Sequence, residues 1–491
     1  MSRRMKPTIN PQILNNGRIN STVIFSSREF ILWFQILFIL LFIFGNSSHA
    51  FQSAALKQLW DVPTGEVKAK TVKSYVMNRI KVEEIYYSSR EFKGKPVKIF
   101  GYFCYPAKFS GKLPAILLSH GGGGTASRPR AVAWAKRGYA VLAIDLPGKG
   151  ENRGGSHSSG PYMDVPVLLR TRPDPSYNYL VHAVAATRNG INYLCQRPEV
   201  DRARIGMIGL SWGGVLAILT NGQDERLKAA VNVFGAGYIP EGCTWEDWFG
   251  AMSTQEISAW YNLIDPRNFL ATQHAPILFI TGTNDHCYYL PTFQKSFLEV
   301  KAEKGLILIP NGKHKFLSSY QTPALAWLDQ YLKGKGNSFP TIAIQNPVMK
   351  GTEKIVIPVK TSAVKGIKRV SLYISAGGPQ QWTIRKWQEI KPHRENGIYY
   401  FGLPARSIEP ETIFYADVKD KTGRGSSTLV QSLIAIKTAP GKRIFAYSSP
   451  IRQTFRHENF HLVGGSGEAV SNLSLAKGAQ NYHFIQKGVS Y

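Results

Sequence analysis

Residues 205–214 read I-G-M-I-G-L-S-W-G-G, and the five residues from Gly209 to Gly213 fit the pattern G-x-S-x-G. This pattern is typical of a strand that turns sharply into a helix and presents the hydroxyl of Ser211 at the turn. Glycine at both ends of the pattern leaves space for the crowded backbone. The N–H groups at the start of the new helix favour negative charge beside the serine. The stretch therefore predicts a nucleophilic serine, although an ordinary strand-to-helix turn would satisfy the same five residues.

Short apolar runs alternate with segments of helical spacing on both sides of Ser211. Apolar strands that alternate with helices are typical of a parallel sheet covered by helices on both faces. We therefore expect an α/β fold with a mostly parallel sheet. The expected strands are residues 115–119, 139–144, 229–234, 276–281 and 305–309, and the expected helices are residues 128–137, 177–194 and 321–332.

A run of four glycines, residues 121–124, follows His120 and the first of these strands. Such a run lets the backbone approach a ligand and offers free N–H groups. Next to a nucleophilic serine, the N–H of Gly121 or Gly122 would form one half of an oxyanion hole, with the N–H of Trp212 as the other half. Without such a serine, the run would be only a flexible loop.

Two further polar side chains follow later strands, Asp285 after residues 276–281 and His314 after residues 305–309. The carboxyl ends of parallel strands lie at one edge of a sheet, so we expect both side chains near Ser211. A histidine can take the proton of a serine hydroxyl near neutral pH, and a carboxylate orients the imidazole. The order serine, aspartate, histidine, with spacings of 74 and 29 residues, predicts a catalytic triad. Taken singly, Asp285 would be a turn residue and His314 a loop histidine.

Four other polar side chains near these strand ends are expected to have structural roles. Asp145 follows a strand and is expected to organise the glycine-rich loop after it, with His157 at the surface of that loop. His286 and Cys287 follow Asp285 directly, and we expect them to pack around it.

From about residue 80 to residue 335 the chain resembles the α/β-hydrolase superfamily, in the branch of acetyl xylan esterases and dienelactone hydrolase-like proteins. The matching stretches are P-A-I-L-L-S-H-G-G-G-G, G-Y-A-V-L-A-I-D, V-D-R-A-R-I-G-M-I-G-L-S-W-G-G, P-I-L-F-I-T-G-T-N-D and P-N-G-K-H-K-F. The resemblance implies hydrolysis of small acyl esters, often acetyl groups on plant polysaccharides, without a metal or any other cofactor.

Two features of this chain differ from related enzymes and restrict the expected substrate and architecture. True dienelactone hydrolases use a cysteine nucleophile where this chain has Ser211, which argues against a lactone substrate. Secreted prolyl-oligopeptidase relatives carry a large propeller, and the 70 residues from Phe51 to His120 are too few to form one.

The first fifty residues have the pattern of a secretory signal. Five basic residues and an apolar run at 31–44 precede Ser48-His49-Ala50, a small-x-small cleavage site. The run of 14 residues is short for a membrane span, which needs roughly 20. We therefore expect cleavage after Ala50 and a secreted or periplasmic protein with no stable membrane span; an uncleaved membrane anchor is the alternative.

Four cysteines follow the predicted leader, at Cys104, Cys195, Cys243 and Cys287. An exported chain could pair some of them, whereas buried thiols are the other interpretation, and the spacing does not decide between the two. No C-x-x-C pair occurs, so a zinc site is not expected.

The formal net charge is +28, and the first fifty residues, with five basic residues and one acidic residue, account for +4 of it. The remaining +24 favours acidic polysaccharide, anionic lipid or nucleic acid as a partner. The basic residues are scattered and no nucleic-acid motif is present, so no nucleic-acid partner is expected. A solvated basic surface is the simplest interpretation, and an anionic polysaccharide is the second.

Residues 235–274 contain Trp245, Trp248 and Trp260. The segment could form a small cap whose aromatic side chains line an acyl or sugar pocket. The same side chains could equally pack as ordinary core.

Beyond a linker at residues 333–338, the pattern changes to short strands without helices, which predicts a β-sandwich of the immunoglobulin-like or jelly-roll type. Its expected strands are residues 354–359, 370–374, 382–387, 398–401, 412–417 and 429–436. The expected division of the chain is a signal peptide at 1–50, an N-terminal approach segment at 51–94, an α/β-hydrolase domain at 95–336, the sandwich at 341–438 and a C-terminal extension at 439–491.

The sequence as a whole predicts an exported serine hydrolase that cleaves carboxylic esters, with a small ester or an acylated carbohydrate as substrate. A peptidase or amidase of the prolyl-oligopeptidase or X-prolyl dipeptidyl peptidase type is the alternative, because some exported enzymes of that kind place a β-sandwich after a similar core. A glycan-binding protein with an inert hydrolase core is the third interpretation.

Overall fold

The computed structural model describes residues 54–148, 157–163, 168–316, 318–351, 353–362, 366–376, 379–409, 412–439, 442–447, 483–484 and 486–487. The predicted signal peptide and most of the predicted C-terminal extension lie outside these residues. The chain divides into two units, Met1–Ala55 and Leu56–Tyr491, and all the elements named below belong to the second unit.

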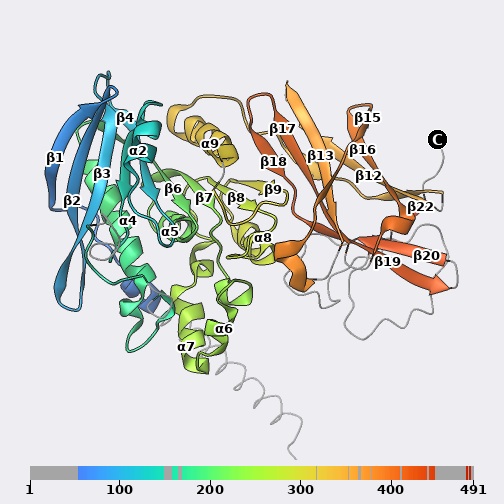
Figure 1. The fold of residues 1–491 in the computed structure, drawn as a ribbon, viewed down its shortest axis with the longest axis horizontal. Coiled ribbons are helices and arrows are strands. Elements are labelled where there is room, and N and C mark those ends of the chain that lie inside the picture. Colours follow the sequence, from blue (N-terminus) through green and yellow to red (C-terminus); the bar gives the residue numbers. More distant parts are fainter. Residues whose placement is uncertain are drawn as a thin grey trace, which may run out of the picture. The chain divides into compact units, whose positions relative to one another are not determined.

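A nine-stranded mixed sheet forms the first half of this unit (Figure 1). The strand order is β1-β2-β3-β5-β4-β6-β7-β8-β9. The first three strands and β5 pair antiparallel, and all pairs from β5 to β9 are parallel. The strands are β1 (Ala69–Met77), β2 (Ile80–Phe92), β3 (Lys95–Pro106), β4 (Leu113–Ser119), β5 (Ala140–Ile144), β6 (Val200–Leu210), β7 (Leu227–Val233), β8 (Ile277–Gly282) and β9 (Lys304–Ile309).

Three strands of this sheet are buried along their whole length, as their apolar sequences predict. Every residue of β4, β5 and β8 is buried. In the sheet, β4 lies between β5 and β6, so the chain runs to one side of β4 and then returns to the other. Open α/β sheets bind ligands beyond the carboxyl ends of the strands at such a switch point. Ser119 at the end of β4 pairs with Gly209 of β6, which brings the glycine run beside Ser211.

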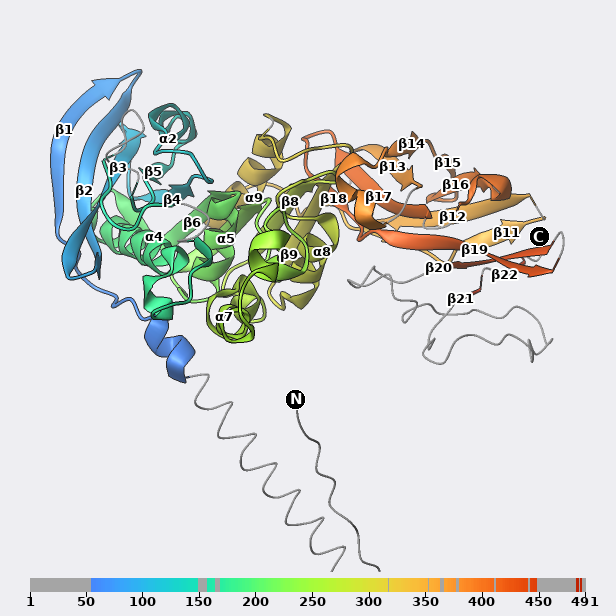
Figure 2. The ribbon, with the colours of Figure 1, turned by 60° about the horizontal axis from the view of Figure 1, so that its bottom comes forward.

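Helices cover both faces of the sheet (Figures 1 and 2). Gly190 of α4 lies against Leu117 of β4, and Gly206 of β6 lies against Leu332 of α9 on the other face. No helix of the described residues is long and apolar enough to cross a membrane. The helices are α2 (Arg128–Ala135), α4 (Tyr179–Gln196), α5 (Trp212–Asn221), α6 (Glu246–Gly250), α7 (Thr254–Ala259), α8 (Leu290–Glu299) and α9 (Gln321–Lys333).

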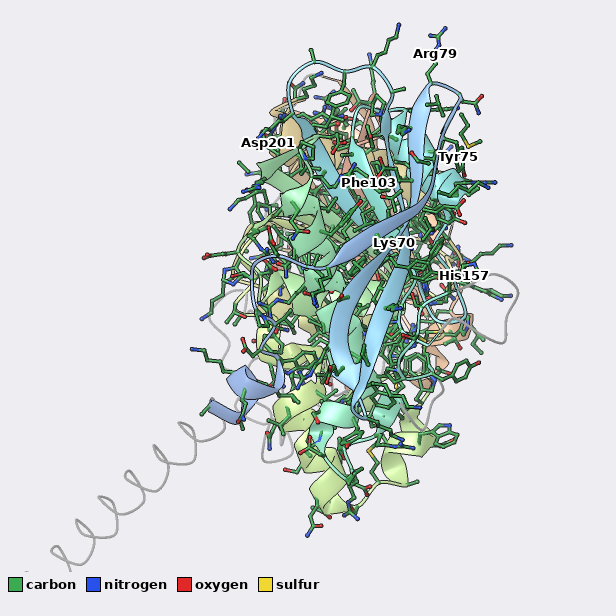
Figure 3. The ribbon with its side chains drawn as sticks, turned by 90° about the vertical axis from the view of Figure 1, so that its left-hand side faces the viewer. Lys70, Tyr75, Arg79, Phe103, His157 and Asp201 are labelled. Carbon is green, nitrogen blue, oxygen red and sulfur yellow. The ribbon has the colours of Figure 1, made fainter. Side chains whose placement is uncertain are left out.

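The edge strand β1 has little apolar alternation, so its sequence does not predict a strand. Seven of its nine residues are exposed, and Lys70 and Tyr75 lie along it (Figure 3). A two-residue turn joins it to β2, with Asn78 at φ 50° and Arg79 at φ 64°. Positive φ at both positions is the geometry of the tight hairpin turn. Exposed lysines on such an edge oppose pairing with other chains.

Two further sheets form the C-terminal half, as the strand-rich pattern predicts (Figure 1). One has the order β15-β16-β12-β11-β22 with β10 on β12, and the other has the order β14-β13-β17-β19-β20-β21 with β18 on β17. Ile357, Phe401, Leu372 and Phe414 share a core between them, so the two sheets form a sandwich. The strands are β10 (Ile342–Ile344), β11 (Val348–Lys350), β12 (Lys354–Thr361), β13 (Ile367–Ser375), β14 (Gln388–Ile390), β15 (His393–Glu395), β16 (Ile398–Pro404), β17 (Thr412–Asp420), β18 (Gly425–Ser427), β19 (Gln431–Ala439), β20 (Lys442–Tyr447), β21 (His483–Phe484) and β22 (Gln486–Lys487).

The prediction of a strand at residues 382–387 is wrong. The structure has a 3-10 helix, Pro379–Ile384, followed by irregular backbone. Trp382 and Trp387 are both buried, in one apolar cluster with residues of the nine-stranded sheet and its helices. The tryptophans therefore pack in a tertiary core and do not alternate along a pleated surface.

Candidate active site

Ser211 stands between β6 and α5 with φ 57° and ψ −119°, a strained conformation for a residue other than glycine. Its N–H donates to the carbonyl of Val233, at 2.8 Å. The neighbouring glycines are required by close contacts. A Cβ at Gly209 would lie 1.7 Å from the carbonyl oxygen of Gly213, and a Cβ at Gly213 would lie 2.4 Å from that of Ser119. Backbone packing therefore forces the sharp turn that presents the Ser211 hydroxyl.

The structure brings Asp285 and His314 to this serine. Nε2 of His314 is 2.8 Å from Oγ of Ser211, and Nδ1 of His314 is 2.7 Å from Oδ2 of Asp285. Oδ1 of Asp285 accepts the N–H groups of Cys287, at 2.8 Å, and Tyr288, at 3.0 Å. With its Nδ1 proton donated to Asp285, the imidazole has a lone pair on Nε2 for the serine proton. The arrangement can therefore deprotonate the hydroxyl of Ser211.

The glycine run lies directly against the turn at Ser211. A Cβ at Gly121 would lie 2.9 Å from both Cβ of Ser211 and the carbonyl oxygen of Leu210. A Cβ at Gly122 would lie 3.1 Å from the Trp212 ring. Trp212 is the first residue of α5. The three predicted oxyanion-hole residues thus meet beside the serine hydroxyl.

His120 holds this loop in place, a role that the sequence analysis did not assign to it. The buried ring has Nδ1 2.7 Å from the carbonyl oxygen of Gly121, and its Nε2 accepts the N–H of Leu146 at 3.0 Å. The two contacts together require a neutral ring with the proton on Nδ1. The signal in the sequence was a histidine directly before the glycines.

Asp145 connects the same loop to the segment after β5. Its buried carboxylate accepts the N–H groups of Ala126 and His157. Asp145 therefore organises two loops, in the way its position at a strand end predicted.

Aromatic rings surround the catalytic histidine candidate. The ring of Phe234 lies 4.5 Å from that of His314 between centroids, and the ring of Tyr288 lies at 6.1 Å. Trp245 packs on Trp212 at 4.9 Å. These side chains form an apolar wall next to Ser211.

The tryptophans of residues 235–274 divide between the two expected roles. Trp245 is half-buried beside Trp212 and so lies next to the site. Trp260 is fully buried and packs on Phe249 in the core. Trp248 is 50% exposed.

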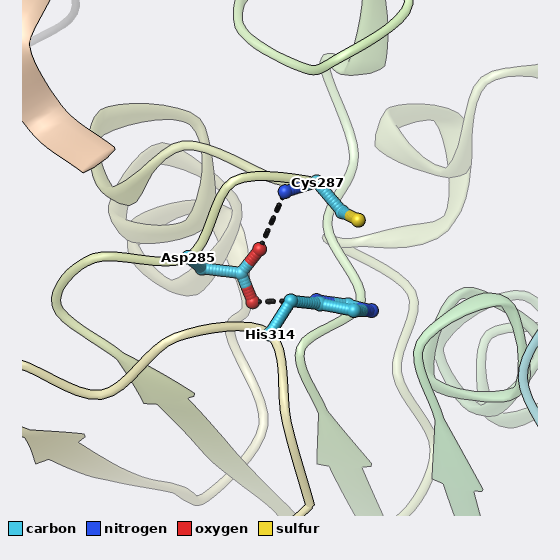
Figure 4. A group of neighbouring side chains, drawn as sticks. All are labelled: Asp285, Cys287 and His314. Atoms are coloured by element: carbon cyan, nitrogen blue, oxygen red, sulfur yellow. Dashed lines mark hydrogen bonds and ion pairs between the residues drawn. The ribbon is translucent and has the colours of Figure 1, made fainter. Parts of the chain in front are cut away.

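Asp285, Cys287 and His314 lie close enough to be considered as metal ligands, with one ligand atom of each within 4.8 Å of the others (Figure 4). However, both nitrogens of His314 already face Ser211 and Asp285. Burial, and secondly the carboxylate of Asp285, raises the pKa of the Cys287 thiol to about 12. A cysteine binds a metal as its thiolate, and a raised pKa disfavours that form. Asp285 and His314 are instead arranged for proton transfer with Ser211.

The cysteines are free thiols in the structure. Cys104 and Cys243 are buried, and burial raises the pKa of each thiol to about 12. Cys195 and Cys287 are half-buried.

Comparisons of sequence relate two consecutive stretches of the chain to different families, and both stretches contribute to the nine-stranded sheet. Residues 48–236 match the family described as acetyl xylan esterase (AXE1), and residues 241–380 match the family described as PhoPQ-activated pathogenicity-related protein. Acetyl esterase Axe7A of Xylanibacter ruminicola is 24% identical over 256 residues, covering 48% of this chain and 56% of that protein. The uncharacterized peptidase YuxL of Bacillus subtilis is 27% identical over 276 residues, covering 51% of this chain and 39% of that protein. This chain thus spans only 39% to 56% of the length of these two relatives.

A solved structure supports the fold. The acetyl xylan esterase from Paenibacillus sp. R4 matches with a TM-score of 0.50 and 22% identity, over 58% of this chain and 94% of that chain. The match therefore covers nearly all of that esterase but only part of this chain. The chain therefore has the α/β-hydrolase fold, followed by a β-rich domain, and its residues 48–236 are similar in sequence to the acetyl xylan esterase family.

Proposed function

We propose that this protein is a serine esterase that removes short acyl groups, acetyl above all, from acylated carbohydrate. The observation that carries the proposal is the continuous hydrogen-bonded series from Ser211 through His314 to Asp285. The similarity of residues 48–236 to the acetyl xylan esterase family supports the ester substrate. The carbohydrate part rests on that similarity alone.

In the proposed reaction, Oγ of Ser211 attacks the ester carbonyl carbon while Nε2 of His314 takes the hydroxyl proton. The N–H groups of Trp212 and of Gly121 or Gly122 stabilise the oxyanion of the tetrahedral intermediate. His314 then gives its proton to the leaving alcohol, and the C–O bond breaks to leave an acyl-serine. A water molecule attacks this ester with His314 again as base, which releases the carboxylic acid and restores Ser211. Asp285 stabilises the imidazolium in both steps.

Hydrolysis of p-nitrophenyl esters of increasing chain length tests this proposal. We expect turnover of the acetate, a steep fall with chain length, and a loss of roughly 10³-fold or more for Ser211→Ala. A Ser211→Ala variant with wild-type turnover would refute the proposed nucleophile.

A peptidase is the second candidate, and its support is the similarity to a relative that is named as a peptidase. The same triad can cleave amides when the site binds a peptide. Aminoacyl p-nitroanilides distinguish the two candidates. Turnover of these amides at a higher kcat/KM than p-nitrophenyl acetate would favour the peptidase. If Ser211 reacts with a fluorophosphonate but neither substrate is cleaved, the small-acyl esterase proposal is wrong.

We also propose that the protein is exported and that its leader is removed after Ala50. The basis is the apolar run at 31–44 between basic residues and a small-x-small site. The mature N-terminus, measured by mass spectrometry on protein from the native host, is expected at Phe51. A start near residue 1 in the membrane fraction would instead indicate an anchor.

A further inference from the structure

We propose that Asn284 and Asn311 are positioning residues, through which the C-terminal β-rich domain holds the two loops that carry Asp285 and His314. The proposal rests on the catalytic roles proposed above for those two side chains. It assigns the C-terminal domain a part in catalysis that does not require it to touch the substrate.

Asn284 precedes Asp285 directly and is buried, with 5% of its surface exposed. Its Nδ2 donates to the carbonyl oxygen of Arg385 at 2.6 Å and more weakly to that of Thr383 at 3.4 Å. Its Oδ1 accepts the hydroxyl of Thr283 at 2.8 Å. Both Nδ2 and Oδ1 of Asn284 therefore have hydrogen-bond partners. Exchanging the two atoms would place the oxygen against the carbonyl oxygens of Arg385 and Thr383.

Asn311 lies three residues before His314 and makes a two-point contact with the same segment. Its Nδ2 donates to the carbonyl oxygen of Trp387 at 2.9 Å, and its Oδ1 accepts the N–H of Trp387 at 2.8 Å. This is the pattern by which one strand pairs with another, supplied here by a side chain. Asn311 is otherwise exposed, so water competes with these bonds more than at Asn284.

The two loops are also bonded to each other. The N–H of Asn311 donates to Oγ1 of Thr283 at 2.8 Å, and the N–H of Asn284 donates to the carbonyl oxygen of Gly312 at 2.8 Å. Residues 383–387 therefore close a ring of hydrogen bonds over both loops. A shift of this segment would move Asp285 and His314 relative to Ser211, which belongs to a different loop.

The segment itself is anchored in the C-terminal domain. The ring of Trp387 packs on Tyr415 of β17 with centroids 5.1 Å apart, and the guanidinium of Arg385 lies 4.9 Å from the ring of Trp382. Both tryptophans are buried. Through Trp387 and Tyr415 the segment is attached to the β-rich domain, and the two asparagines connect it to the loops of Asp285 and His314.

Other contacts join the two halves without touching these loops. Oε1 of Gln294 in α8 accepts the N–H of Val430, and the N–H of Leu308 in β9 donates to Oγ of Ser427. These bonds offer a matched control, because they cross the same boundary away from the catalytic loops. A Gln294→Met variant keeps the side-chain length and removes the acceptor.

The test is steady-state hydrolysis of p-nitrophenyl acetate and the rate of fluorophosphonate labelling, both on the full mature chain. We expect Asn284→Ala to lower kcat by roughly tenfold with KM changed less than twofold, because small misplacements of catalytic groups affect the chemical step. Asn311→Gly should lower kcat severalfold, and labelling should slow in proportion. Glycine is chosen at Asn311 because φ there is 57°, so the variant removes the amide without adding backbone strain. It also keeps the proposal testable if Asn284→Ala does not fold.

Three outcomes would overturn the inference. If both asparagine variants fold and keep wild-type kcat and labelling, the contacts have no positioning role. If they lower only the melting temperature, they stabilise the domain boundary and nothing more. If Gln294→Met lowers kcat as much as Asn284→Ala does, any loosening of the boundary suffices and the two asparagines are not special. Ser211→Ala with wild-type turnover is a separate result, since it would refute the esterase mechanism itself.

Discussion

The turn at Ser211 and the segment at residues 383–387 border the same catalytic loops but are held in different ways. The turn is held by backbone contacts so close that a Cβ at Gly209 or Gly213 has no space. The segment is held by the amides of Asn284 and Asn311 and by the packing of its own Trp387 on Tyr415. Steric exclusion permits one conformation, whereas each side-chain hydrogen bond contributes only about 1 kcal/mol to stability. The nucleophile is therefore expected to be rigid, and the acid–base pair to depend on the attachment of the second domain.

The largest effect on stability is expected from a substitution in the turn itself. We expect Gly209→Ala to destabilise the protein by about 4 kcal/mol or more, or to prevent folding, because its Cβ would lie 1.7 Å from a backbone oxygen. Gly250→Ala is the matched control, since a Cβ there meets nothing within 4 Å. Urea unfolding of both variants provides the measurement. A Gly209→Ala protein as stable and active as the control would show that the turn can relax.

The attachment of the second domain should depend on pH through Asp417 of β17. Burial raises the pKa of this carboxyl to about 6, against 3.8 normally, although Ser427, Lys419 and Arg369 oppose the rise. Oγ of Ser427, which accepts the N–H of Leu308 in β9, donates to Asp417. Asp417 is therefore linked to the boundary between the halves.

Between pH 4 and pH 6 the folded carboxyl keeps a proton that the unfolded chain has released. Stability should therefore fall as the pH rises through this window, by about 2 kcal/mol, and Asp417→Asn should lack this fall. Urea unfolding of the variant and the wild type at pH 4 and pH 7 measures the difference. If the free energies of unfolding of Asp417→Asn and the wild type change equally between pH 4 and pH 7, burial does not raise the pKa of Asp417.

The smallest expected effect concerns Trp245, which packs on Trp212 beside the nucleophile. If this ring limits the space for the acyl group, Trp245→Ala should raise kcat/KM for butyrate relative to acetate by roughly five- to tenfold. Trp248→Ala is the control, because that ring is half exposed. An unchanged ratio would assign Trp245 a packing role only.

Much of the catalytic half could be predicted from local sequence. The strands β4, β5 and β8 were predictable because they are short apolar runs, and such runs are buried wherever they occur in an α/β sheet. The proximity of Ser211, Asp285 and His314 followed from their positions at the ends of parallel strands. The edge strand β1 was not predictable in the same way, because an exposed strand has no apolar alternation to reveal it. The helix α8 was not predicted either.

The sequence alone thus determined the elements whose conformation depends on near neighbours: the glycines around Ser211, the apolar strands and the order of the three polar groups. Only the tertiary structure decided that residues 382–387 are not a strand and that His120, Asn284 and Asn311 support the site. Their partners lie as far as 101 residues away in sequence. Isolated histidine and asparagine residues, or a pair of tryptophans, have no periodicity, so their roles depend entirely on what the fold places beside them.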